Sequence, residues 1–264
     1  MRTTLKIFRS TICVIVVFTF VSCSTVKETG RRQLLLINPA QEMQLGLTAF
    51  EELKKEQPSS KDSAGTDLVR RVGKRIAGVA ELPNAQWEFV LFDSQEPNAF
   101  CLPGGKVGVY TGILPITKTE AGLAAVMGHE VAHATAHHGA ERMSEAMLLQ
   151  TGGQVIGAAV SDPQTQSAFM SAYGVGKTLV RELPHSRKQE SEADYIGLIY
   201  MARAGYNPQE AVAFWERFAD FNRRAGGGTP WFLRTHPLDE QRIADLKTNL
   251  PKAMDEYRKA GGRQ

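Results

Sequence analysis

Hydrophobic residues recur at every third or fourth position along much of the chain, and this spacing predicts helices. The first such stretch follows Asn38-Pro39, which suits a helix start because Asn caps free backbone amides and Pro fits the first turn. We expect this helix to reach about Lys55 and a polar loop to cover residues 57–65. Thr66 is the predicted cap of the next helix, which ends before Pro83.

Two shorter stretches, Trp87–Phe92 and Lys106–Tyr110, carry bulky or alternating apolar residues and predict strands. Pro103-Gly104-Gly105 between them predicts a turn, so we expect the two strands to be neighbours. Two interpretations stay open: a plain hairpin in the core, or an edge strand that holds an extended peptide by backbone pairing. The expected fold class is α+β, mainly α, with a small antiparallel sheet.

A long helical stretch is predicted after the strands. Thr117 and Glu120 have the spacing of a capping box, and no proline interrupts the run that follows. We expect this helix to continue towards Gln150 and to end at Gly152-Gly153.

The later part of the chain contains two glycine-rich segments. Residues 155–179 are small and apolar, and they suit a helical hairpin, a flap over a site, or a segment resting on a membrane surface. Gly226-Gly227-Gly228 suits a movable loop. Between the two segments, Asn207-Pro208 caps a predicted scaffold helix from Ala211 to Phe221.

Within the long helical stretch lies the sequence His129-Glu130-Val131-Ala132-His133. Side chains four residues apart share one face of a helix, so both imidazoles can point at one metal ion. Glu130 then lies beside the metal, where it can take a proton from an attacking water, and the pattern is a known zinc protease signature. Two core histidines at this spacing by chance are the alternative. His137 and His138 cannot both share that face, and we interpret them as structural or solvent-facing.

Catalytic zinc has three protein ligands, so a further carboxylate is expected downstream. Glu190 and Asp194 lie four residues apart on a second predicted helix. Glu190 can reach the metal, and Asp194 can accept a hydrogen bond from the outer nitrogen of a ligand histidine. Glu192 points about 200° away from Glu190 and cannot share this role. An acidic, solvated helix face is the alternative.

The N-terminal residues have the pattern of a lipoprotein signal peptide, residues 1–22. Basic residues precede an apolar run, Ile12–Val21, that is too short to span a bilayer. The run ends at Ser22-Cys23, which resembles a lipobox, so Cys23 is the predicted lipid attachment site in a bacterial cell envelope. Ser24 after it favours the periplasmic side of the outer membrane. An ordinary secreted protein is the alternative. Residues 23–37 are then a polar tether, 38–250 the main domain, and 251–264 a C-terminal tail.

Composition adds little further function. The formal charge of +3 comes from 31 basic and 28 acidic residues, and removal of Arg2, Lys6 and Arg9 with the signal peptide balances the two. No basic run with interleaved aromatic residues is present, so nucleic acid is not an expected partner. Cys101 is the one cysteine left after Cys13 and Cys23, so the mature chain cannot form an internal disulfide.

Four separated motifs, in this order, resemble the HtpX/Oma-type HExxH zinc metallopeptidase family, and within it the soluble periplasmic BepA/LoiP-like branch. They are Asn98-Ala99-Phe100 with Leu102-Pro103-Gly104-Gly105 and Tyr110-Thr111-Gly112-Ile113-Leu114, His129-Glu130 with His133, Ser186-Arg187 with Gln189-Glu190 and Ala193-Asp194, and Thr235-His236-Pro237 with Arg242.

The resemblance implies a zincin-like metallopeptidase domain with one Zn²⁺ per chain, held by His129, His133 and Glu190. It implies that His236 approaches the zinc in a resting state or stabilises the tetrahedral intermediate. It also implies misfolded or stalled envelope proteins as substrates, and outer-membrane assembly machinery as a possible partner. An extended substrate is then expected along a strand whose predicted contact residues are Asn98, Gly104, Gly105 and Val107.

The resulting hypothesis is a zinc endopeptidase in which Glu130 is the general base. The rival hypothesis is a metal-stabilised envelope chaperone with latent or gated peptidase activity. An aminopeptidase is a third interpretation, but no cluster of acidic residues in the sequence resembles an amine-binding site.

Overall fold

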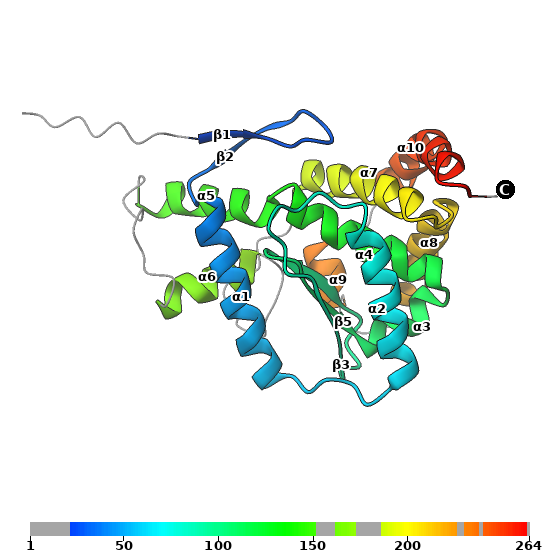
Figure 1. Cartoon of the computed structure of the whole chain (residues 1–264), viewed down its shortest axis with the longest axis horizontal. Helices are drawn as coiled ribbons and strands as arrows, with labels where there is room; N and C mark the ends of the chain where they lie inside the picture. The colour runs from blue at the N-terminus through cyan, green and yellow to red at the C-terminus, as the bar shows by residue number, and fades with distance from the viewer. Residues whose placement is uncertain (1–21, 152–161, 173–185, 226–229, 238–239, 263–264) are drawn as a thin grey trace, which may run out of the picture.

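Helices dominate the computed structural model, which describes residues 22–151, 162–172, 186–225, 230–237 and 240–262. They surround a small three-stranded sheet (Figure 1), which confirms the mainly helical α+β prediction. The helices are α1 (Pro39–Glu56), α2 (Ser63–Ala77), α3 (Leu114–Thr117), α4 (Glu120–Thr135), α5 (His138–Thr151), α6 (Pro163–Ala172), α7 (Arg187–Arg203), α8 (Gln209–Ala225), α9 (Trp231–Thr235) and α10 (Glu240–Lys259), with a 3₁₀ turn η1 (Thr111–Ile113). The strands are β1 (Ser22–Thr25), β2 (Arg32–Leu35), β3 (Glu88–Phe92), β4 (Ala99–Leu102) and β5 (Lys106–Tyr110).

The first helices begin where side chains satisfy their free amides. Asn38 caps α1 as predicted, through a hydrogen bond from the Gln41 amide to its side chain. The prediction that Thr66 caps α2 is wrong. Asp62 caps α2 instead, because its Oδ1 accepts from the Gly65 amide at 3.0 Å and Thr66 already lies inside the first turn.

Helix α4 is shorter than predicted at both ends. The expected capping box does not form because Thr117 belongs to α3, and the α4 cap is Thr119, whose Oγ1 accepts from the Gly122 amide at 2.9 Å. At the other end the helix stops at Thr135 instead of running on towards residue 150. His137 adopts a left-handed backbone (φ 55°), which breaks the helical run, so α5 starts afresh at His138.

The sheet is mixed, where an antiparallel sheet was expected. Strands β3 and β5 are neighbours, as predicted, but they run parallel. β4 lies just before the predicted turn, in a segment for which no strand was predicted, and pairs antiparallel with the other side of β5. Of the two interpretations left open for these strands, the one that makes β5 an edge strand is wrong, because both sides of β5 are paired. The turn before β5 places Gly104 and Gly105 at φ 80° and 79°, which explains the two glycines there.

Each face of the sheet is covered by a hydrophobic core. Ala99 and Cys101 of β4 face the core shared with α4 and α7, and Phe100 and Leu102 face the core shared with α1. This alternation follows from the two-residue period of a strand. Because β4 packs directly against α4, the sheet supports the helix that carries the HExxH motif.

Folded structure extends on both sides of the predicted 38–250 domain. The predicted tether, 23–37, forms the β1–β2 hairpin, because Arg31 makes buried ion pairs that a solvated tether does not make. The predicted C-terminal tail, 251–264, is largely helical, since α10 continues through Pro251 and buries Ala253. Most of residues 155–179, and Gly226 to Gly228, lie outside the described residues. Across the part of the chain that is described, none of the helices has the length and hydropathy that crossing a membrane requires.

Candidate metal centre

Two facing glycines bring the central helices into contact at the candidate site. A Cβ atom on Gly197 of α7 would lie 2.9 Å from the backbone nitrogen of His129, and one on Gly128 of α4 would lie 3.0 Å from the Gly197 carbonyl oxygen. The helices can therefore approach closely only without side chains at these positions. Glu190 lies two turns before Gly197 on the same face of α7, so this approach carries its carboxylate to the HExxH histidines.

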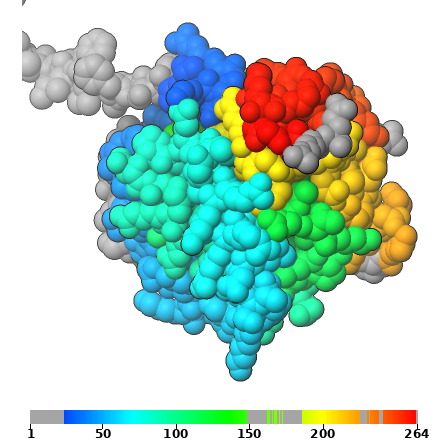
Figure 2. Space-filling view, turned by 45° about the vertical axis from the view of Figure 1, so that its right-hand side comes forward, coloured from blue at the N-terminus to red at the C-terminus, as the bar shows by residue number. Residues whose placement is uncertain are grey.

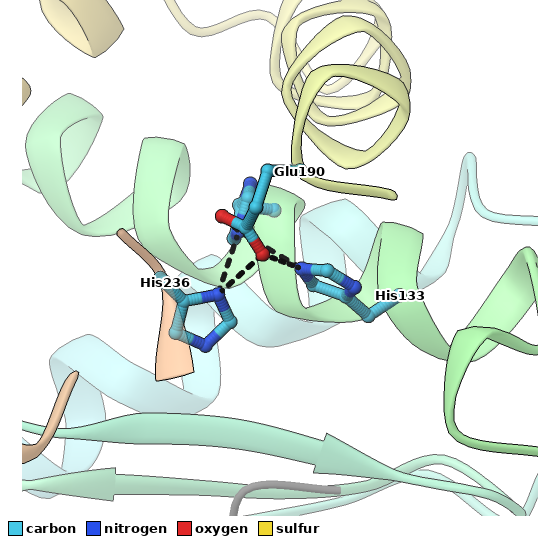
Figure 3. Close-up of side chains that lie close together, drawn as sticks. His133, Glu190 and His236 are labelled. Carbon is cyan, nitrogen blue, oxygen red and sulfur yellow. Dashed lines mark hydrogen bonds and ion pairs between the residues drawn. The ribbon is translucent and has the colours of Figure 1, made fainter. Parts of the chain in front are cut away.

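Four side chains converge at this contact, and Figure 3 labels three of them, His133, Glu190 and His236. His129 and His133 come from α4, Glu190 from α7, and His236 from the residue after α9. One ligand atom from each lies within 4.8 Å of the other three, and all four residues are buried. The two Nε2 atoms of the α4 histidines are 3.0 Å apart, and Glu190 oxygens lie 3.5 Å from that of His129 and 3.3 Å from that of His133. The structure thus brings the three predicted ligands together.

His236 closes the remaining side of this cluster. Its Nδ1 lies 3.1 Å from Glu190 Oε1 and 3.2 Å from His129 Nε2. Figure 3 shows its ring and that of His133 meeting the Glu190 carboxylate from different elements. The predicted approach of His236 to the metal ligands is thus present in the geometry.

Asp194 and Arg242 form the outer contacts of His129. Asp194 Oδ1 lies 2.9 Å from His129 Nδ1, at the position expected from its spacing to Glu190. Arg242 of α10 pairs with both acids, through Nε to Asp194 Oδ2 at 2.7 Å and Nη1 to Glu190 Oε2 at 2.7 Å. Its guanidinium also stacks on the Trp215 ring at 3.7 Å. Sequence reasoning assigned Arg242 no role, although two buried acids on one helix face require a nearby cation.

His133 has a longer outer chain, which sequence reasoning missed. Its Nδ1 lies 2.8 Å from His138 Nδ1, and His138 Nε2 lies 2.9 Å from Glu192 Oε2. Glu192 touches none of the three predicted ligands, as expected, but it reaches His133 through His138. The bend at His137 brings His138 back to His133, and residue spacing along a straight helix does not predict such a bend. His137 itself pairs with Glu42 at 2.7 Å and is structural.

These outer contacts fix the tautomers of the two motif histidines. An ionised carboxylate can only accept, so Asp194 assigns the Nδ1 proton to His129. In the same way Glu192 assigns the Nε2 proton to His138, whose Nδ1 then accepts from His133 Nδ1–H. Both Nε2 lone pairs therefore point into the cluster, towards each other and the Glu190 carboxylate. Such a donor set, two imidazole nitrogens and one carboxylate, fits zinc.

The electrostatics of the cluster favour a bound cation. Burial alone would lower the pKa of His129, but hydrogen bonding and charge from Asp194, with Glu190, raise it to about 9. Burial lowers the pKa of His133 well below its usual value. For Glu190, the raising effect of burial is outweighed by Arg242 and His236, so its pKa lies well below the usual range. The cluster thus stabilises one positive charge, which a proton or a metal can supply.

Glu130 is placed for proton transfer beside the cluster. It is buried, and its Oε1 makes no hydrogen bond to any described residue; His236 Nε2 lies 3.6 Å away. Burial raises the pKa of its carboxyl group. A buried acceptor with no protein donor is suited to a water or a substrate group.

The predicted substrate-contact residues are not exposed along a free strand. Val107 is fully buried on the central strand, so its backbone cannot pair with a peptide. Gly104 packs near Met43 and Leu47, and Gly105 near Trp87. Asn98 precedes β4, and its Oδ1 accepts from the Ala99 amide at 3.0 Å. In the order β3-β5-β4, β4 is an edge strand and packs against α4.

Comparison with known proteins places the chain in a family. The sequence profile of peptidase family M48 matches residues 63–250. The chain is 35% identical over 242 residues to the mitochondrial metalloendopeptidase OMA1 of Schizosaccharomyces pombe, covering 90% of this chain and 69% of that protein. It is 38% identical over 181 residues to the Saccharomyces cerevisiae protein of the same name, covering 67% and 50%.

A bacterial relative is also similar. The β-barrel assembly-enhancing protease of Escherichia coli K12 is 30% identical over 232 residues, which cover 86% of this chain and 47% of that protein. The chain thus spans about half the length of this relative and of the Saccharomyces protein. The profile match, these relatives and the buried His129, His133 and Glu190 cluster agree: this chain belongs to peptidase family M48 and is a metallopeptidase.

Proposed function

We propose that the chain is a zinc-dependent endopeptidase of the bacterial cell envelope that hydrolyses peptide bonds in misfolded or stalled envelope proteins. One observation carries the catalytic part of this proposal. His129, His133 and Glu190 converge in a buried cluster, and Glu130, whose Oε1 has no hydrogen-bond donor among the described residues, lies beside it.

Each residue then has a defined task. His129, His133 and Glu190 would hold one Zn²⁺, which when bound would lower the pKa of a water to about 7 and polarise the scissile carbonyl. Glu130 accepts a proton from the attacking water and delivers it to the leaving amine. Burial raises its pKa, which suits a group that must both take and release a proton.

His236 determines whether the site is open. With His236 the cluster offers four protein donors, whereas a catalytic zinc site keeps one position for water or substrate. We therefore assign the described arrangement to a resting state, from which His236 must turn away. In the resting arrangement its Nε2 lies 3.6 Å from Glu130, so a small movement would keep His236 close enough to the general base to donate to the oxyanion.

An extended substrate fits the free side of β4 better than the strand first expected. The Tyr110 amide donates to the Asn98 carbonyl, so in this antiparallel register the backbone groups of Ala99 and Cys101 point away from β5. A peptide pairing there would extend the sheet beyond β4. Substrate contact at Asn98 stays a prediction, whereas pairing at Val107 is excluded by its central strand.

The cellular setting rests on the N-terminal pattern and one relative. The signal-like residues 1–22, with Cys23 as lipid attachment site, support the periplasmic side of the outer membrane. The E. coli relative is named for β-barrel assembly, which supports misfolded envelope polypeptides as substrates and the assembly machinery as partner. The yeast relatives are named mitochondrial, and fractionation of the native host separates the two locations.

The decisive experiment replaces Glu130 with Gln. This substitution preserves the shape of the side chain but removes its basicity, so the variant should retain one zinc per chain, measured by elemental analysis, and lose cleavage of an unfolded protein. Unchanged cleavage in the variant contradicts the mechanism. The closed four-donor cluster also favours the rival gated chaperone, which predicts that wild-type protein suppresses aggregation without cleavage.

A further inference from the structure

The N-terminal hairpin reaches the metal cluster through a continuous chain of side chains. Arg31 lies in the turn before β2, and its Nε donates to Glu192 Oε2 at 2.5 Å. Glu192 accepts from His138, and His138 accepts from the ligand His133. Figure 2 shows this hairpin, in dark blue, lying beside α7, in yellow, on the surface.

The chain is built in the same way as the outer contacts of the other histidine. At His129, the ligand is oriented by Asp194 and that carboxylate is held by Arg242. At His133, the carboxylate is Glu192 and its arginine is Arg31, with one extra imidazole in between. Each motif histidine is thus connected to an acid on α7 and to an arginine from a distant part of the chain.

Arg31 is fixed in place by more than one partner. Its Nη1 and Nη2 donate to the two oxygens of Glu141 at 2.6 and 2.9 Å, and Nη2 also donates to Gln33 Oε1 at 3.1 Å. Thr29, in the same turn, donates to Glu192. Without the guanidinium, two largely buried carboxylates, Glu141 and Glu192, have lost their shared cation. Glu192 then turns towards water, and His138 loses the acceptor that fixes its tautomer.

We propose that His138 is a positioning residue for the ligand His133, and that Glu192 and Arg31 hold it, so that the hairpin turn is part of the metal site. This inference rests on the metal-binding role proposed above for His133. Replacement of such outer partners lowers metal affinity by about 10- to 100-fold.

The test measures zinc affinity by competition with a chromogenic chelator, and the visible spectrum of the Co²⁺-loaded protein. His138→Leu should weaken zinc binding by about 10- to 100-fold and alter the Co²⁺ bands. Arg31→Met should weaken zinc binding by about tenfold or less. Arg32→Met is the matched control, because Arg32 is the next residue along the chain, at the start of β2, and its side chain is exposed; it should change neither readout.

The double variant separates positioning from general destabilisation. If Arg31 acts through His138, Arg31→Met should have no further effect on zinc affinity once His138 is Leu, although both changes lower the melting temperature of the metal-free protein. His138→Asn, whose amide oxygen occupies roughly the Nδ1 position, should restore much of the affinity and be insensitive to Arg31→Met.

Three results overturn the inference. They are unchanged zinc affinity in His138→Leu, effects of Arg31→Met that add in full to those of His138→Leu, and equal losses in Arg31→Met and Arg32→Met. If the wild-type protein binds zinc and cleaves an unfolded protein while the variants give these results, only this inference is refuted. Wild-type protein that binds no zinc refutes the proposed function as well.

Discussion

Replacement of Arg242 with Met should destabilise the metal-free protein far more than the zinc-loaded protein. The guanidinium makes buried contacts with two carboxylates, at 2.7 and 2.9 Å to Asp194 and 2.7 Å to Glu190. Removal of one partner from a buried ion pair costs roughly 3–5 kcal/mol, because a charge is left buried without compensation. In a domain of this size that corresponds to a fall of roughly 6–20 °C in melting temperature.

Zinc changes this cost because it compensates Glu190 directly. In the zinc-loaded variant the uncompensated charge is that of Asp194, which still has His129, so the loss should shrink by about 1–3 kcal/mol. Urea unfolding of wild type and variant, each with excess zinc and with chelator, gives the four free energies that are needed.

The matched control is Arg75→Met. Arg75 also lies over an aromatic ring, Tyr206, at 4.0 Å, but it is half exposed and its acid, Glu120, is 3.6 Å away. Its removal should cost about 1 kcal/mol or less, with or without zinc. If Arg242→Met destabilises both metal states equally, the side chain acts only by packing on Trp215, and the charge argument is refuted.

The remaining predictions concern packing, ligand orientation and pH. Gly197→Ala should destabilise the protein by about 1–3 kcal/mol and weaken zinc binding, because its Cβ would meet the His129 backbone at 2.9 Å. Gly78→Ala is the control, because its Cβ would be no closer than 3.5 Å to its neighbours. Equal unfolding midpoints for the two variants would disprove the close-approach argument. Asp194→Asn should lower zinc affinity about 10- to 100-fold in the chelator assay, since an amide can hold His129 in the wrong tautomer; an unchanged affinity would remove Asp194 from the site. Burial raises the pKa of Tyr110 to about 12, so the neutral form stabilises the fold below pH 10 and up to about 2.7 kcal/mol is lost as pH rises from 10 to 12. Denaturation curves of Tyr110→Phe should lack this loss, and an identical pH profile in the variant would contradict it.

Local patterns in the sequence predict the metal-site residues because each pair of them lies on a single helix, which sets the spacing within the pair. His129 and His133 face one point as soon as α4 is helical, and Glu190 and Asp194 do the same on α7. The pairing of the two helices needed the family resemblance, although the glycines that allow it, Gly128 and Gly197, are visible in the sequence.

The remaining parts of the site depend on bends and chain turns that the spacing of hydrophobic residues does not predict. The left-handed His137 redirects the chain so that His138 returns to His133, whereas a straight helix would carry it away. Hydrophobic spacing likewise identified β3 and β5 but missed β4, so the order of strands, and with it the free edge, was wrong. Arg31 lies in a segment too polar to predict as folded, yet it is fixed by partners more than a hundred residues away.

The buried charges around the cluster explain why a divalent ion suits this fold. If Glu130, Glu190 and Asp194 are all ionised, they carry three negative charges against the single positive charge of Arg242. Protons can supply the missing two charges, because the pKa of Glu130 is raised by burial and that of His129 is raised to about 9, against the effect of burial, by Asp194. One bound Zn²⁺ would supply the same two charges and would leave Glu130 free to act as the proposed base. The positive charge that stabilises the buried acids is therefore the same charge that would activate the site. Because the metal replaces protons, metal binding should release protons.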